Sequence, residues 1–160
     1  MKNRIIRLIT LNALFAALYV ALTIALGDLS FGYSGLISFR VAELLICVCC
    51  FDKRFIPGAI LSCFLANILG GGAVVDIIVG TIQTAITVLI LYFVKPKILA
   101  VTLGALVCGV IIGIMLVLLG FSTIGYWIIL TTFVGEYIIL LIGLILFKKI
   151  FFGKNKIKIV

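Results

Sequence analysis

Long apolar stretches alternate with short polar connections along the chain. The apolar stretches cover residues 5–26, 34–51, 55–69, 74–94, 98–119 and 124–147. A helix needs about 20 apolar residues to cross the hydrocarbon core of a bilayer, so the third stretch is short and the second is only just adequate. The pattern predicts an all-α integral membrane protein whose six transmembrane helices form a single domain, residues 1–160.

Basic residues occur in only every second polar connection. They open the chain, recur as Lys53 and Arg54 and again as Lys95 and Lys97, and fill the C-terminal tail, whereas the connections between these points have none. Short loops rich in lysine and arginine stay on the cytoplasmic side of a membrane. The charges therefore predict that both termini are cytoplasmic and that the intervening connections are external.

Composition narrows the class of protein. Hydrophobic residues make up 66% of the chain and charged residues 11%, which is far from the usage of soluble domains. In 160 residues, six helices leave no room for a catalytic or nucleotide-binding domain. We expect no enzymatic activity, and any uphill transport must draw its energy from an ion gradient or a partner. The net charge of +8 indicates attraction to anionic lipid rather than to nucleic acid.

The cysteines do not indicate a metal centre. All five lie in apolar stretches, and the chain has no histidine. A zinc site or a Cys/His nucleophile is therefore not expected, nor is any other cofactor. We interpret the cysteines as small hydrophobic residues.

Acidic residues in the apolar stretches carry the candidate chemistry. Glu136 lies near the middle of the sixth stretch, where a carboxylate is costly unless it faces the bundle interior and meets a partner. We predict a functional role for Glu136, over a structural one bonded to a neighbouring Thr or Tyr. Glu43 follows Arg40 by three residues, and Asp76 opens the fourth stretch. For these residues a ligand-binding role stands against an i,i+3 ion pair and a helix N-cap, respectively.

Two amide side chains extend this polar set. Asn67 lies near the outer end of the third stretch, and Gln83 follows Asp76 by two helical turns on the same face. Together with the acidic residues, they predict a polar pocket that is open towards the outside and closed towards the cytoplasm.

Small residues recur on one face of the first predicted helix. Because they are spaced by four residues, they lie along one helix face, where they allow another helix to approach closely. From the spacing alone, docking of a partner and packing within the protein's own bundle are equally supported. We assign Gly109 and Gly113 of the fifth stretch to internal packing. The residues of this alanine stripe are Ala13, Ala17, Ala21 and Ala25.

Several segments resemble motifs of the QueT family. They are residues 37–45, which include Arg40 and Glu43, residues 56–58, 65–71 and 75–80, and the Gly135-Glu136 pair. The likeness covers essentially the whole chain, although Gln83 stands where a small residue is expected. QueT proteins are substrate-binding (S) components of energy-coupling-factor (ECF) vitamin transporters. The resemblance thus implies a bacterial cell-membrane protein and favours the alanine stripe as a docking face.

The resemblance also implies a ligand, because QueT proteins are assigned to uptake of queuosine precursors. These are 7-deazaguanine bases that carry a cyano or an aminomethyl group. A guanine-like edge presents two N–H donors that one carboxylate can accept, and aromatic rings can stack on the flat base. Tyr126 and Trp127 can stack too, or belong to the aromatic belt of a membrane interface. The expected ligand-binding residues are Glu136, Arg40, Glu43, Asn67, Asp76, Phe39 and Tyr137.

An S component implies partners. In the family mechanism the loaded S component associates with a transmembrane coupling protein and two cytoplasmic ATPases, which drive release of the cargo inside. Two alternatives remain open. One is an S component for another small aromatic vitamin, such as thiamine or riboflavin, and the other is a gradient-driven, proton-coupled carrier, for which a midplane Glu136 is equally natural.

Overall fold

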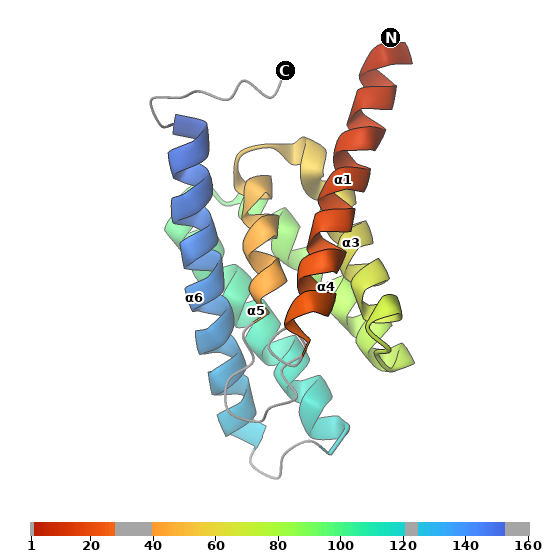
Figure 1. Cartoon of the computed structure of the whole chain (residues 1–160). Helices are drawn as coiled ribbons and strands as arrows, with labels where there is room; N and C mark the ends of the chain where they lie inside the picture. Colours follow the sequence, from red (N-terminus) through yellow and green to blue (C-terminus); the bar gives the residue numbers. More distant parts are fainter. Residues whose placement is uncertain (1, 28–39, 121–124, 153–160) are drawn as a thin grey trace.

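The computed structural model of the chain is a bundle of helices, shown in Figure 1, and it describes residues 2–27, 40–120 and 125–152. No strand occurs in these ranges. The elements are α1 (Lys2–Leu26), the 3₁₀ helices η1 (Val41–Cys50) and η2 (Lys53–Phe55), α3 (Ile56–Leu69), α4 (Val74–Phe93), α5 (Lys97–Leu118) and α6 (Gly125–Phe152). The predicted all-helical membrane bundle is confirmed.

Among the described residues, four helices are long and apolar enough to cross a membrane: α1, α4, α5 and α6. By contrast, η1 has 10 residues and α3 has 14. At about 2.0 Å per residue for a 3₁₀ helix and 1.5 Å for an α-helix, each is roughly 20 Å long, less than the ~30 Å hydrocarbon core. The chain is a multi-pass membrane protein in which two shorter helices pack among four long ones.

Successive helices run in alternating directions through the bundle. In Figure 1 the start of α1, the η1–α3 connection and the end of α6 lie at one end of the molecule, and the α3–α4 turn lies at the other. The first of these ends carries Lys53 and Arg54 in η2 and Lys149 in the last turn of α6. Basic residues from distant parts of the sequence therefore gather at one end of the bundle.

Two predicted boundaries differ from the structure. Arg40 has a non-helical backbone and η1 begins at Val41, so Glu43 lies in the first turn rather than two turns inside a helix. Helix α6 continues to Phe152 instead of ending near residue 147. In this extension Phe151 stacks on Phe51, with ring centroids 5.3 Å apart. The contact gives the helix a packing surface beyond its lysines.

Residues next to the ends of α1, α4 and α5 terminate these helices near the predicted positions. Gly27 follows α1 with a φ of +45°, and Gly120 follows α5 with a φ of +80°. Glycine adopts this left-handed conformation readily and often ends a helix. The Lys97 ammonium group donates to the carbonyls of Leu91 at 2.7 Å and Tyr92 at 3.2 Å. It thereby satisfies two of the carbonyl groups left without a partner at the end of α4.

The interior of the bundle contains small side chains together with large apolar ones such as Ile46 and Leu91, while many other large apolar side chains face outwards. Leu14 and Leu118 are 71% and 81% exposed, as expected for residues that contact lipid. A Cβ at Gly109 would lie 2.8 Å from Phe133 Cβ, and one at Gly113 would lie 2.6 Å from Ile129 Cγ1. The prediction that these glycines serve packing between α5 and α6 is confirmed.

The five cysteines are free, and all are buried, as predicted for small hydrophobic residues. Cys47 donates a hydrogen bond from its Sγ to the Leu140 carbonyl at 3.1 Å, which joins η1 to α6. Gly143 permits this approach, because a Cβ there would lie 2.7 Å from the Leu44 carbonyl oxygen and 2.8 Å from Cys47 Sγ. The helix η1 is therefore held closely against α6 in the middle of the bundle.

A polar clamp fixes α1 to the start of α3 at the basic end. Asn12 donates through Nδ2 to the Arg54 carbonyl at 3.0 Å, and Gly58 N–H donates to Asn12 Oδ1 at 2.7 Å. A Cβ at Gly58 would lie 2.5 Å from that Oδ1, so a side chain there would displace the amide. Nearby, Arg54 and Asp52 form an ion pair at 2.7 Å. Partial burial opposes ionisation of Asp52, but hydrogen bonds and charge from Arg54 hold its pKa below the ordinary value.

Candidate functional site

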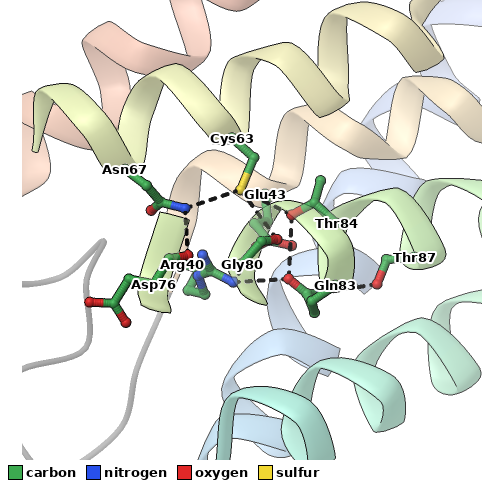
Figure 2. Close-up of polar contacts among 9 residues, drawn as sticks. All are labelled: Arg40, Glu43, Cys63, Asn67, Asp76, Gly80, Gln83, Thr84 and Thr87. Atoms are coloured by element: carbon green, nitrogen blue, oxygen red, sulfur yellow. Dashed lines mark hydrogen bonds and ion pairs between the residues drawn. The ribbon is translucent and has the colours of Figure 1, made fainter. Parts of the chain in front are cut away.

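A cluster of buried polar and charged side chains lies where η1 packs against α3, α4 and α6. Sequence positions far apart converge there, and Figure 2 shows the part that joins the start of η1 to α3 and α4. Transmembrane proteins keep such groups in the interior, where they can meet one another instead of lipid. The members from the expected ligand-binding set are Arg40, Glu43, Asn67 and Glu136.

Arg40 and Glu43 form the i,i+3 ion pair that the sequence offered as one interpretation. The distance from Arg40 Nη1 to Glu43 Oε1 is 2.7 Å, and the two side chains are 15% and 0% exposed. The backbone makes this possible because the Glu43 N–H donates to the Arg40 carbonyl at 2.8 Å, which closes the first turn of η1. The pair is thus built at the very start of η1, with both side chains directed into the bundle.

Gln83 of α4 holds the arginine in place. Arg40 Nη1 donates to Gln83 Oε1 at 3.1 Å, and Gln83 Nε2 donates to Thr87 Oγ1 at 3.0 Å. Thr84 adds a hydrogen bond from its hydroxyl to Gln83 Oε1 at 3.3 Å. The side chains of Gln83, Thr84 and Thr87 are fully buried. Gln83, whose role the sequence left open, is therefore a positioning residue for Arg40 (Figure 2).

Glu136 brings a second carboxyl group to the cluster from α6. Its side chain is 0% exposed. It lies close enough to interact directly with the Glu43 carboxyl and the Cys108 thiol. Arg40 contacts Glu43 as an ion pair. None of the four carboxylate oxygens of Glu43 and Glu136 has a hydrogen-bond donor among the described residues.

Without a ligand, this arrangement costs the protein free energy of folding. Two buried carboxylates face one guanidinium group, and buried acceptors without donors each cost on the order of 1–3 kcal/mol. A ligand that supplies N–H donors or positive charge would satisfy these oxygens. The cluster therefore has the chemistry of a binding site, and Glu136 has the interior position predicted for it.

Asn67 reaches the same region from α3. It is 5% exposed, and its Nδ2 donates to the Asp76 carbonyl at 3.3 Å. Gly80 leaves room for this amide, since a Cβ there would lie 2.8 Å from Asn67 Nδ2 and 3.8 Å from an Arg40 Nη2 atom. The absence of a side chain at Gly80 thus allows the Asn67 amide to lie against α4 in the region that Arg40 also reaches (Figure 2).

Asp76 caps α4, but not as the N-cap residue that the sequence suggested: Ala73 is the N-cap, and Asp76 is the third residue of the helix. Its carboxylate accepts a hydrogen bond from the Ala73 N–H at 3.1 Å, which caps the N-terminus of α4. In Figure 2 the carboxylate points away from Arg40 and Glu43. The structure therefore places Asp76 beside the cluster and not within it, and ligand contact by this residue stays a prediction.

The aromatic residues considered for the site lie in different surroundings. Phe39 lies outside the described residues. Tyr137 is half-buried and stacks on Phe133 with ring centroids 6.1 Å apart. Tyr126 and Trp127 are 76% and 54% exposed at the start of α6, which favours the interfacial belt over the site.

Several residues that surround the charged cluster were not predicted from the sequence. Tyr19 of α1 is buried and interacts electrostatically with Glu43 and Glu136. Cys63 of α3 accepts a hydrogen bond from Thr84 Oγ1 at 3.2 Å. The polar positions 83, 84 and 87 in an otherwise apolar stretch indicate an inward-facing surface. No comparable pattern points to Tyr19 or Cys63, whose roles depend on neighbours distant in sequence.

The alanine stripe lies on the outer face of α1. Ala13, Ala17, Ala21 and Ala25 are all exposed, while Tyr19 and other residues of the opposite face are buried in the bundle. Helix α1 therefore packs against η1 and α3 with the face that carries Phe15 and Tyr19, and the stripe lies outside that contact.

Comparison with known proteins places these features in context. The profile described as QueT transporter matches residues 9–151. The Queuosine precursor transporter QueT of Lactococcus lactis subsp. cremoris (strain MG1363) is 36% identical over 85 residues, which cover 53% of this chain and 48% of that relative. The chain thus spans about half the length of the curated relative that it matches. No solved structure matches the chain.

Proposed function

The chain belongs to the QueT transporter family, and we propose that it is the substrate-capture (S) component of an ECF-type importer for a queuosine precursor. The relative in L. lactis bears the name of a queuosine precursor transporter. The observation that carries the proposal for this chain is the pair of buried carboxyl groups of Glu43 and Glu136, whose oxygens lack hydrogen-bond donors. A nucleobase with a guanine-like edge supplies such donors.

The proposed contacts follow from the chemistry of a 7-deazaguanine base. Glu136 accepts the two parallel N–H groups of the base, as a carboxylate accepts an arginine fork. Arg40, already held by Gln83, donates to the ring carbonyl. A buried acceptor that would otherwise be left unpaired discriminates strongly against ligands without the matching donors. Tyr137 remains a candidate for stacking on the base.

Ligand binding tests this proposal directly. We expect the purified protein in detergent to bind 7-cyano- or 7-aminomethyl-7-deazaguanine in calorimetric titrations, and mass spectrometry of ligand retained during purification to find one of them. Thiamine and riboflavin serve as controls because they lack the guanine-like edge. Displacement of the deazaguanine by thiamine or riboflavin would instead favour a different vitamin.

The membrane topology we propose has six spans with both termini in the cytoplasm. Support comes from the gathering of basic residues at one end of the bundle and from the alternating helix directions (Figure 1). Single cysteines at positions 95 and 122 of a cysteine-free protein, treated with an impermeant thiol reagent on intact cells, test it. We expect labelling of Ser122→Cys and none of Lys95→Cys, and the reverse pattern would contradict the topology.

The alanine stripe is the proposed docking face for a transmembrane coupling protein, which would act with two ATPase subunits. Its exposure supports this role, because close helix contact in lipid depends on small side chains. We expect Ala17→Trp or Ala21→Trp to abolish transport and association with the partner while ligand binding survives. Leu18→Trp, at a 51% exposed position of the same helix, is the control. Loss of ligand binding with association intact would assign the stripe to the protein's own fold.

A proton-coupled carrier is a second candidate, which the buried carboxylate pair favours because such pairs relay protons in transporters. The two mechanisms differ in their source of energy. Uptake of the deazaguanine in cells that lack the ATPase subunits would favour the carrier, whereas an S component requires them. We expect no concentrative uptake in such cells.

A further inference from the structure

We propose that Glu43 and Glu136 share one proton while the site is empty, and that capture of the ligand releases this proton to the solvent. The identity of the ligand rests on the proposed function. The shared proton does not, because it follows from the groups that the fold brings together.

The first reason is the balance of charge. Arg40 compensates one carboxylate through its 2.7 Å contact with Glu43. Glu136 is fully buried next to that pair, so two ionised carboxylates would leave an uncompensated negative charge away from water. Such a charge is far more costly than a neutral acid, and two adjacent carboxylates share a site by keeping one proton. One proton leaves the cluster neutral overall.

The second reason is the missing donor. Apart from the ion-pair contact between Arg40 and Glu43, the described residues offer no hydrogen bond to the four oxygens of the pair. A protonated carboxyl group has an O–H that its neighbour can accept. A proton between Glu43 and Glu136 therefore supplies the donor that the surrounding helices do not.

The surroundings provide no second counter-charge among the described residues. The pair interacts with Tyr19 of α1, Cys63 of α3 and Cys108 of α5. It also interacts with Cys47 of η1. Phenol and thiol groups of these kinds are neutral at pH 7. On α4 the nearby side chains are Gln83, Thr84 and Thr87, which do not ionise, while the carboxylate of Asp76 points away from Arg40 and Glu43 (Figure 2).

The release step follows from what the ligand needs. To accept two N–H bonds, both oxygens of Glu136 must act as acceptors, so the shared O–H bond breaks. The proton does not stay on Glu43, because the contact with Arg40 favours the ionised form of that carboxyl. It leaves to the buffer, and the two N–H donors of the ligand stabilise the charge that Glu136 then carries. The ligand's two N–H···O bonds form in place of the O–H bond. Because the ligand binds the ionised pair, its apparent affinity rises with pH, by up to about tenfold per pH unit, until the empty site has itself lost the proton.

Infrared spectroscopy of the empty protein tests the shared proton without any ligand. Between about pH 6 and pH 8, ordinary carboxyl groups are ionised, so the carbonyl stretch of a protonated acid isolates this pair. We expect a band that shifts in D₂O, is lost in Glu43→Gln and in Glu136→Gln, and persists in Asp52→Asn, where a carboxylate at the basic end is changed to its amide. Absence of the band from the wild-type protein overturns the proposal.

Calorimetry tests the release. Titration of 7-cyano-7-deazaguanine, which is neutral, in buffers of different ionisation enthalpy counts the protons given up on binding. We expect one proton per ligand for the wild-type protein and for Asp52→Asn, and none for Glu43→Gln, whose affinity should no longer depend on pH. Monodisperse elution and an unchanged helical circular dichroism spectrum confirm that the variant is folded.

The outcomes separate this inference from the proposed function. Binding of the base without release of a proton by the wild-type protein overturns the release and leaves the proposed function standing. An infrared band without binding of either deazaguanine supports the shared proton and contradicts the proposed ligand. Neither band nor binding contradicts both.

Discussion

Two arginine–carboxylate pairs of this protein have the same separation but different surroundings. Arg54 and Asp52 lie 2.7 Å apart at the basic end of the bundle, with side chains 43% and 12% exposed. Arg40 and Glu43 also lie 2.7 Å apart, with side chains 15% and 0% exposed. The outer pair is complete, because Arg54 donates to both oxygens of Asp52. The inner pair has a second carboxyl group, Glu136, beside it.

The comparison shows that the distance within an ion pair does not determine what the pair does. Water reaches the Arg54 side chain, so the attraction within the outer pair is screened and its loss is better tolerated. The inner charges are buried away from water. Their hydrogen-bond donors and counter-charges must therefore come from the protein, from a proton or from a ligand. A binding site for a polar ligand inside a membrane protein requires buried groups whose hydrogen bonds and charges the protein itself leaves uncompensated.

The largest effect is expected from removing the inner cation. Arg40→Met leaves two buried carboxyl groups without their counter-charge, and breaking a buried pair in this way costs about 3–5 kcal/mol of unfolding free energy. Denaturant unfolding in detergent measures the loss. The double variant Arg40→Met/Glu43→Gln should recover most of it. A loss as small as that of Arg54→Met would mean that burial does not distinguish the two pairs.

The second largest effect is expected from replacing Glu136, the second carboxyl group beside the inner pair. Glu136→Gln keeps the size of the side chain but places an N–H donor against a donor of the ligand, and bonds to charged groups are each worth roughly 1.5–3 kcal/mol. We expect the affinity for a deazaguanine to fall by about tenfold to several hundredfold, with the fold intact, as measured by calorimetry. Wild-type affinity in a folded variant would remove Glu136 from the site.

A smaller effect is expected from the residue that positions the inner arginine. Gln83→Leu removes the acceptor of Arg40 Nη1, and a buried donor without a partner costs about 1–3 kcal/mol. Both thermal stability and ligand affinity should fall, because Arg40 is no longer held. Thr102→Leu, at a half-buried position of α5, offers a control of similar chemistry whose hydroxyl bonds only within its own helix. Unchanged affinity would show that Gln83 does not orient Arg40 for the ligand.

The smallest effect is expected from a substitution in the outer pair, Arg54 and Asp52. Asp52→Asn should lower the unfolding free energy by no more than about 1 kcal/mol. Because Arg54 lowers the folded-state pKa of Asp52, the stabilisation is present above the unfolded-state pKa and is lost as the pH falls through the folded-state pKa. Unfolding at decreasing pH, with and without salt, measures it. A loss comparable to that of Arg40→Met would contradict the distinction.

Much of the fold can be read from local sequence, because lipid imposes a simple rule on long helices. The predicted stretches 74–94 and 98–119 correspond to α4 (Val74–Phe93) and α5 (Lys97–Leu118) within one residue at each end. Proline, glycine and lysine mark these ends and act on their immediate neighbours. The inward position of Glu136 was equally accessible, since a carboxylate in the middle of an apolar helix has few other places to lie.

Only the tertiary structure decided which buried residues of these helices contact one another. The break before η1 places Arg40 against Gln83, the extension of α6 rests on the contact between Phe151 and Phe51, and the meeting of Glu43 with Glu136 joins η1 to α6. Hydropathy and charge fix which segments enter the membrane, because each segment meets the same solvent independently. They do not fix which buried polar groups meet, because that depends on how closely the helices pack and on residues, such as Gly80 and Gly143, that allow the approach.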